Sequence, residues 1–97
     1  MDIVYLESTV SDLTWMRHYY ETVFPEGLKK AQQQFHATVA LLTDNPFIGH
    51  PTHRKRVREF SIPQTPFSYI YRVQPNRIEV LRVWDERQDR GRIYNAL

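Results

Sequence analysis

One stretch, residues 67–84, constrains the fold of this 97-residue chain more than any other. It holds two runs, residues 67–73 and 78–84, that are rich in aromatic and β-branched side chains, which fit the pleated surface of a sheet. Gln74-Pro75-Asn76 between them is typical of a turn. The pattern predicts a β-hairpin. Because apolar residues occur on both faces of each run, we expect the two strands to be central and at least partly covered on each side.

Strict alternation of side chains assigns the residues of the second strand to opposite faces of the sheet. The two groups that it predicts are Ile78, Val80 and Trp84 on one face, and Leu81 and Val83 on the other. Arg72, Arg77 and Arg82 interrupt the hairpin, and guanidinium groups in so apolar a setting need carboxylate, phosphate or solvent at their tips. The hairpin is therefore predicted to be both core and candidate site.

Composition sets the domain organisation. With 41% hydrophobic and 25% charged residues, residues 1–97 are expected to form a single domain. The absence of cysteine excludes disulfides and thiolate metal sites, and fits a reducing compartment. The start of the chain is too short and too acidic for a signal peptide, and no apolar run approaches the roughly 20 residues of a membrane span. We expect a cytoplasmic protein that does not enter a membrane.

Charge is distributed unevenly along the chain. Residues 1–50 hold three basic and six acidic side chains, whereas residues 51–97 hold ten basic and five acidic ones. A basic half rich in arginine favours an acidic partner, either nucleic acid or an acidic protein segment. The alternative is an ordinary solvated surface in which nearby carboxylates neutralise the arginines.

Periodicity along the chain predicts the order β-α-α-β-β-β. Both helices carry apolar residues at the i, i+3, i+4, i+7 spacing, and Pro25 and Pro46 end them. Residues 47–56 read as the longest irregular segment, and the tail after Trp84 as a short helix or an extended arm. The predicted elements are a strand at 2–7, helices at 10–24 and 28–44, and strands at 57–62, 67–73 and 78–84. This order predicts an α+β fold, with a helical hairpin packed on one face of a small, mainly antiparallel sheet.

His50 and His53 are the two imidazoles closest together in the sequence, and imidazoles can bind metal or transfer protons. A metal site would want a third protein ligand, so no metal is predicted. As an acid or base, either histidine would be supported by the basic run that follows, Arg54, Lys55, Arg56 and Arg58. A plain surface loop remains the alternative. Without a glycine-rich phosphate loop or a nucleophile elbow, no cofactor is expected.

Five features in order carry a resemblance to a known family. They are the element order, Asn45-Pro46-Phe47-Ile48-Gly49 after the second helix, Arg58-Glu59, residues 67–73 and residues 78–84. Together they resemble the ParE/RelE superfamily of toxins from bacterial type II toxin–antitoxin modules, which include plasmid-stabilisation systems. The resemblance implies a hetero-oligomer with a cognate antitoxin, whose acidic, partly disordered C-terminal segment wraps the toxin.

The RelE-like branch of this superfamily cleaves messenger RNA on the ribosome. Membership of that branch would imply catalytic roles drawn from Arg58, Arg87, Tyr94, His50 and His53. The sequence departs from the RelE pattern in two places: Ser68 stands where that pattern has an arginine, and the acidic pair Asp85-Glu86 follows the last strand. Acidic side chains beside a scissile phosphate weaken the electrostatic stabilisation that its cleavage requires.

The ParE-like branch poisons DNA gyrase and is not known to be enzymatic, and the chain resembles it more closely. The resemblance then implies antitoxin- or target-binding roles for Arg58, Arg72, Arg82, Trp84 and Arg87. A third possibility is an inactive relic that only binds antitoxin. We therefore expect a toxin that inhibits gyrase and so blocks DNA replication, with the messenger RNA endonuclease as the alternative.

Overall fold

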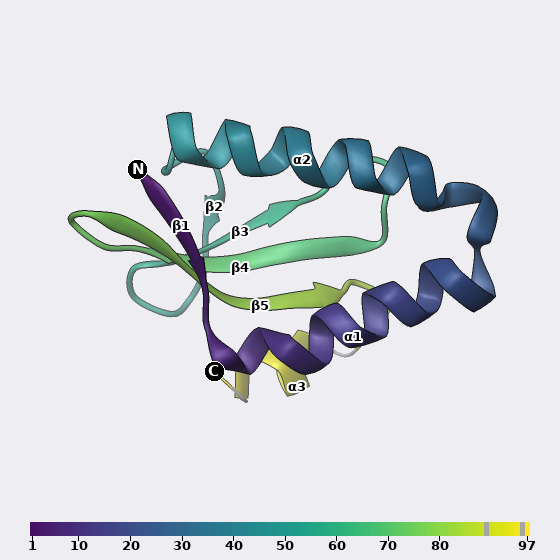
Figure 1. Ribbon diagram of the computed structural model, residues 1–97. Helices are drawn as coiled ribbons and strands as arrows, with labels where there is room; N and C mark the ends of the chain where they lie inside the picture. The colour runs from purple at the N-terminus through teal and green to yellow at the C-terminus, as the bar shows by residue number, and fades with distance from the viewer. Residues whose placement is uncertain (89, 96) are drawn as a thin grey trace.

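A five-stranded sheet in the order β1-β5-β4-β3-β2 lies at the centre of the fold, and the predicted hairpin supplies two of its inner strands (Figure 1). The computed structural model describes residues 1–88, 90–95 and 97. The strands are β1 (Asp2–Tyr5), β2 (His50–Pro51), β3 (Val57–Ser61), β4 (Phe67–Val73) and β5 (Arg77–Asp85). All neighbours are antiparallel except β1 and β5, which are parallel. The predicted α+β arrangement is confirmed.

Two helices cover one face of the sheet. They are α1 (Val10–His18), which follows a 3-10 turn η1 (Glu7–Thr9), and α2 (Leu28–Asp44). A π-helical turn η2 (Tyr19–Val23) and a 3-10 turn η3 (Pro25–Gly27) connect them. From this connection the two helices diverge, so that they form a V over the sheet (Figure 1). In the described part of the chain, no helix has the length and apolar character needed to cross a membrane.

The π-helical turn corrects the prediction of one regular helix over residues 10–24. Its wider backbone turn breaks the 3.6-residue period after His18, so the end of the predicted apolar stripe turns toward solvent. Tyr20 is buried, but Val23 and Phe24, which the stripe placed in the core, are 60% and 45% exposed. Val10, at the other end of the predicted stripe, is exposed too.

A β-bulge in β5 overturns the predicted faces of the hairpin. Ile70 is opposite Arg82 whereas Tyr71 is opposite Val80, so Leu81 is an extra residue on β5. Beyond the bulge each side chain points to the face opposite to the one that alternation predicts. Val83 therefore joins Ile78 and Val80 under the helices, and Trp84 lies on the far face.

The far face is covered by a third helix, α3 (Arg90–Asn95). Its Ile93 and Tyr94 pack with Trp84, Ile70 and Val57 in a second apolar cluster. Of the two alternatives for the tail, a short helix or an extended arm, the helix is the one observed. The sheet is thus covered on both faces, as the apolar character of its central strands predicts.

Residues 47–56 are less irregular than predicted, because His50–Pro51 forms the short edge strand β2. The turn before it is held by the side chains of two neighbouring strands. The hydroxyl of Tyr71 donates to the carbonyl of Pro46 (2.8 Å) and accepts from the backbone N–H of Gly49 (2.9 Å). Arg58 donates to the carbonyls of Phe47 (3.1 Å) and Gly49 (2.7 Å). Three of the family-like sequence features, residues 45–49, Arg58-Glu59 and residues 67–73, therefore meet in one structural unit.

Candidate functional site

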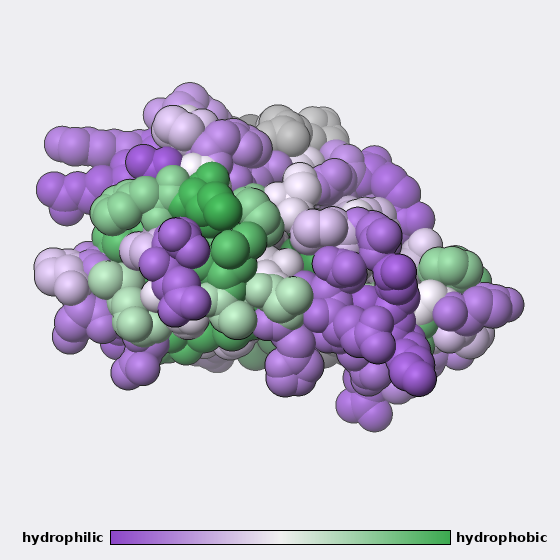
Figure 2. Space-filling view, turned by 90° about the horizontal axis from the view of Figure 1, so that it is seen from above, coloured by the Kyte–Doolittle hydropathy of each residue, from purple (hydrophilic) through white to green (hydrophobic). Residues whose placement is uncertain are grey.

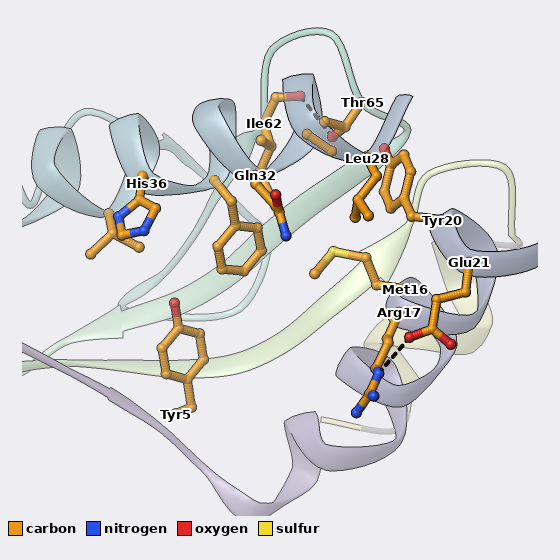
Figure 3. A pocket seen from close by; sticks show the side chains of 13 residues that line it. Tyr5, Met16, Arg17, Tyr20, Glu21, Leu28, Gln32, His36, Ile62 and Thr65 are labelled. Carbon is orange, nitrogen blue, oxygen red and sulfur yellow. Dashed lines mark hydrogen bonds and ion pairs between the residues drawn. The ribbon is translucent and has the colours of Figure 1, made fainter. Parts of the chain in front are cut away.

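An apolar groove lies between the diverging helices, with the sheet as its floor (Figure 3). Its volume is about 840 Å³. Met16 and Tyr20 line it from the α1 side, and Leu28 and Phe35 line it from α2. The remaining lining residues are Tyr5, Arg17, Glu21, Ala31, Gln32, His36, Val39, Ile62 and Thr65. The groove exists because the helices contact the sheet but separate from each other after their connection.

The floor of the groove is neutral. Tyr5 and Tyr69 share a hydrogen bond of 2.8 Å between their hydroxyl oxygens. Burial raises the pKa of both phenols above the ordinary value of tyrosine, so both remain protonated at neutral pH. The ring of Phe35 packs on that of Tyr69 with 5.2 Å between their centroids. A polar ligand would find few partners on this floor, whereas an apolar side chain would be well accommodated.

Charge is confined to the rim of the groove. Arg17 and Glu21 form an i, i+4 ion pair on α1 with 2.8 Å between nitrogen and oxygen, and both side chains are largely exposed (Figure 3). On the opposite side His36 is exposed on α2. An apolar trough with a polar rim is the form in which proteins bind the apolar face of an amphipathic helix.

A second apolar surface lies outside the groove. Leu41, Phe47 and Ile48 are 38%, 65% and 44% exposed. Figure 2, which looks down on the α2 side, shows hydrophobic surface gathered toward the end of the molecule at which α2 ends. The guanidinium of Arg58 lies over the ring of Phe47, 5.2 Å from its centroid, and holds that ring in place.

The predicted binding arginines of the hairpin have carboxylate partners within the chain. Arg82 makes a two-pronged contact with Asp12 of α1, with both nitrogen–oxygen distances at 2.7 Å. Asp12 also accepts from the backbone N–H of Val83 (3.0 Å). Hydrogen bonding to Asp12 raises the pKa of Arg82. This pair fastens α1 to β5, and only 18% of the Arg82 side chain is exposed.

Arg72 and Arg77 share one acceptor, the carboxylate of Glu79. Arg72 binds its Oε1 through two nitrogens at 3.0 and 2.6 Å, and Gln74 adds a bond of 3.2 Å to the same atom. Arg77 binds Oε2. The hydrogen bonds from Arg72, Gln74 and Arg77 lower the pKa of Glu79 to about 2. The turn end of the hairpin is thus a closed ionic network with an excess of positive charge.

Arg87 pairs with Asp85, which was predicted to repel a phosphate. Two guanidinium nitrogens bind the carboxylate at 2.8 and 2.6 Å, and the indole N–H of Trp15 donates to it at 3.3 Å. Burial alone would raise the pKa of Asp85, but these bonds outweigh it and the pKa is lowered. The guanidinium also lies over the ring of Tyr19, 4.6 Å from its centroid. Trp15, Tyr19 and Arg87 form a partly exposed aromatic and cationic surface, here called the Trp15 surface.

Trp84, predicted to bind a partner, is 2% exposed and lies beneath α3. Arg58 is turned toward the backbone of residues 47–49, as described above. Both residues therefore support the fold directly. Their positions in the core and at a turn explain why they stand in the sequence features that resemble the family.

The candidate catalytic residues lie in three separate places. Tyr94 lies close to both histidines: its ring is 4.9 Å from that of His53, and its hydroxyl donates to Glu59 (2.6 Å), which lies 4.0 Å from the Nε2 of His50. Arg58 points to the opposite face of β3, and Arg87 lies at the far end of β5. Tyr94 and Glu59 are 4% and 1% exposed, so the hydroxyl faces the interior and not a substrate.

The position of Ser68 also bears on RNA cleavage. Its side chain is fully buried and donates to Glu86, which also accepts from Ser61 (2.6 Å). A carboxylate therefore stands beside the place where the RelE pattern has an arginine. In residues 1–88, 90–95 and 97, no group of three or more His, Cys, Asp or Glu side chains is arranged to hold a metal ion.

Sequence reasoning missed the groove and the pairing of Arg82 with Asp12. Met16 and Phe35 were placed on apolar stripes, and a stripe does not show whether the helices close over it or diverge. Asp12 binds Arg82 across the sheet edge, and no local pattern in the sequence indicates that contact. A signal was present for Glu79, because a carboxylate two residues from Arg77 on a strand points to the same face.

Comparison with known proteins agrees with this architecture. Residues 3–90 match a family described as the ParE toxin of type II toxin-antitoxin system, parDE. Among solved structures the chain is similar to one titled chromosomal ParDE TA system from P. aeruginosa, with a TM-score of 0.66 and 29% sequence identity. That similarity covers 86% of this chain and 92% of the other. None of the curated proteins compared with the chain matches it.

A helical hairpin over a small, mainly antiparallel sheet, with an unfilled apolar groove between its helices, fits the toxin component of a type II toxin–antitoxin module. With the match over residues 3–90, the chain belongs to the ParE toxin family. The ParE-like branch expected from the sequence is confirmed. A toxin of such a module has a cognate antitoxin as its partner.

Proposed function

We propose that this toxin inhibits DNA gyrase and that its antitoxin neutralises it by laying an amphipathic segment into the groove between α1 and α2. The single observation that carries the antitoxin part is the groove, about 840 Å³ of apolar space with a charged rim. Gyrase as target is supported by membership of the ParE family and by the resemblance given above.

The geometry argues against the alternative, messenger RNA cleavage. That chemistry needs cationic groups free to stabilise charge on a phosphate. Arg87 is instead held by Asp85, Arg58 by backbone carbonyls, and Tyr94 is buried against Glu59. These contacts favour a protein that acts by binding.

The Trp15 surface is the part of the molecule that we propose contacts gyrase. Tryptophan and arginine dominate the energetics of protein interfaces, and Trp15 is 40% exposed although it is large and apolar. It lies on the side of α1 away from the groove residues Met16 and Tyr20. Antitoxin and target would then use different sides of the same helix.

The target is tested with purified toxin, gyrase and plasmid in one assay, and with translating ribosomes and a reporter message in another. We expect the toxin to inhibit the supercoiling of the plasmid by gyrase and to leave the reporter messenger RNA uncleaved. Trp15→Ala should lower gyrase inhibition at least tenfold, whereas Val10→Ala, an exposed position on the same helix, should leave it unchanged. Site-specific cleavage of the message with unaffected gyrase would overturn the proposal.

The groove is tested separately by titrating antitoxin into the toxin and two matched variants. Leu28→Glu places a charge in the groove, and Leu41→Glu places the same charge on the same helix outside it; both leucines are 38% exposed. We expect Leu28→Glu to weaken antitoxin binding at least tenfold and Leu41→Glu to leave it within twofold. Equal losses for the two variants would show that the antitoxin does not occupy the groove.

A further inference from the structure

The loop between β2 and β3 carries a concentration of positive charge that the proposed function does not use. Its residues Arg54, Lys55 and Arg56 are all exposed, and among the described residues no carboxylate pairs with any of them. The arginines of the hairpin and Arg87 differ, because each of them has a carboxylate partner within the chain. We propose that this segment, here called the basic loop, binds the phosphate backbone of double-stranded DNA.

The basic loop is held in one shape by hydrogen bonds at both ends. Thr52 donates from its backbone N–H (3.1 Å) and its hydroxyl (2.9 Å) to the carbonyl of Val57, and its hydroxyl accepts from the N–H of Arg54 (3.2 Å). The Arg54 guanidinium donates to the carbonyl of Tyr94 (2.9 Å), which ties the loop to α3. Arg56 has a φ of 66°, a left-handed conformation that closes the turn. A preformed loop loses little conformational entropy when it binds.

The register of the sheet extends the positive surface beyond the loop. Val57, the first residue of β3, is opposite Arg72, so the basic loop lies at the same end of the sheet as the β4–β5 turn (Figure 1). At that turn the two guanidinium groups of Arg72 and Arg77 share one carboxylate and leave a net positive charge. Five cationic side chains thus lie at one end of the molecule.

Chemistry at the loop favours a phosphate backbone over a protein segment. An amphipathic protein segment binds through its apolar face, and residues 52–56 offer no apolar side chain on which that face could pack. Contacts to DNA phosphates need little more than arginine, lysine and hydroxyl groups. Unpaired nucleic acid is read by stacking on exposed aromatic rings, whereas the one ring of the loop, that of His53, already packs against Tyr94. These features favour double-stranded DNA over a protein segment and over single-stranded nucleic acid.

The test measures binding of the full-length toxin to a fluorescent 20-base-pair DNA duplex over a range of salt concentrations. Each phosphate contact contributes about 0.9 to the slope of log K against log salt, so the double variant Lys55→Gln/Arg56→Gln should lower the slope by about 1.8. At position 56, glutamine should be strained by the left-handed backbone to the same extent as arginine. The substitution should therefore leave the shape of the basic loop unchanged. Lys29→Gln/Lys30→Gln removes the same charge from the exposed side of α2 and is the matched control.

We expect the control to bind like the wild type and the loop variant to bind at least tenfold more weakly at low salt, with both variants folded by circular dichroism. Equal losses in the two variants would overturn the inference, because the effect would then be one of net charge. Tighter binding to single-stranded DNA, or a loop-dependent affinity only for an acidic peptide, would overturn it too. The result is independent of gyrase, since the assay contains none.

Discussion

At the scale of single residues, Gly49 occupies a position that has no room for a side chain. A Cβ atom there would lie 2.5 Å from the hydroxyl oxygen of Tyr71 and 2.9 Å from the carbonyl oxygen of Glu59. Tyr71 is fully buried, so neither neighbour can move aside. Gly49→Ala should therefore lower the free energy of unfolding by about 1–3 kcal/mol, measured by urea denaturation.

Gly27→Ala provides the control for this prediction. A Cβ atom there would also meet a ring, that of Phe24, but this ring is 45% exposed and can rotate into solvent. We expect its free energy of unfolding to stay within about 0.5 kcal/mol of the wild type. Equal costs at the two glycines would show that the contacts around Gly49 are loose.

Glu79 gives the toxin a defined pH dependence. Hydrogen bonds from Arg72, Gln74 and Arg77 lower its pKa to about 2, against about 4.3 in an unfolded chain. The folded state therefore binds fewer protons, and the stabilisation by Glu79 is complete above about pH 4.3 and is lost as the pH falls toward 2. The difference in Tm between wild type and Glu79→Gln should shrink over this range. A difference in Tm that stays constant over this range would contradict the prediction.

Sequence reasoning at this scale recognised that the hairpin arginines require partners and left the partners open. It allowed for neutralisation by nearby carboxylates, and Glu79 does neutralise Arg72 and Arg77, as Asp85 does Arg87. It did not find Asp12, because 70 residues separate Asp12 from Arg82 and the contact depends on how α1 crosses the sheet edge.

At the scale of elements, the attachment of α1 to β5 explains how the sheet ends. Beyond Val80, β1 no longer pairs with β5, and side chains of the next segment replace it. Ser8 donates to the carbonyl of Leu81 (2.7 Å), and Asp12 accepts from the N–H of Val83. Backbone groups on a sheet edge need such partners when they are covered.

Replacing Asp12 should therefore detach α1 at its first turn. Asp12→Ala leaves Arg82 without its carboxylate in a poorly hydrated place, and we expect the free energy of unfolding to fall by about 3 kcal/mol. Arg17→Ala, which breaks an exposed pair on the same helix, should cost far less, because solvent screens exposed ion pairs. Chemical denaturation followed by tryptophan fluorescence measures both. A small loss for Asp12→Ala would mean that apolar packing alone holds α1.

Elements with a strong periodic signal were predictable, and those defined by local irregularity were not. The second helix and the three longer antiparallel strands were foreseen close to their observed bounds, and the first helix was foreseen at its start but not at its end. The π-helical turn, β2 and the bulge were missed, because each depends on tertiary contacts and leaves little trace in hydrophobic spacing. The groove follows from the divergence of two correctly predicted helices, which no pattern within either helix encodes.

At the scale of the whole molecule, the open groove leaves apolar side chains of the free toxin accessible to solvent. Antitoxin that binds only the folded toxin should stabilise it through linkage. An antitoxin segment at 100 times its Kd should raise the free energy of unfolding by about 2.7 kcal/mol, visible as a higher Tm by calorimetry. A Tm independent of the antitoxin concentration would contradict this.

The distribution of charge over the molecule differs from the one that the comparison of residues 1–50 with residues 51–97 indicates. Much of the arginine excess after residue 50 is balanced by carboxylates of the same half or by Asp12. Among the described residues, the basic loop is where three cationic side chains without a carboxylate partner, Arg54, Lys55 and Arg56, follow one another. The sequence predicted a basic face, and in the structure many of its arginines are neutralised within the chain.

The extra residue in β5 has a further consequence for the course of the chain. Along a strand, odd- and even-numbered residues point to opposite faces of the sheet. The extra residue Leu81 exchanges the two faces for every residue of β5 that follows it. Without the bulge, the indole of Trp84 would point toward α1. Ile93 and Tyr94 would then meet no large ring on the far face of the sheet. One inserted residue thus determines on which side of the sheet the chain finishes.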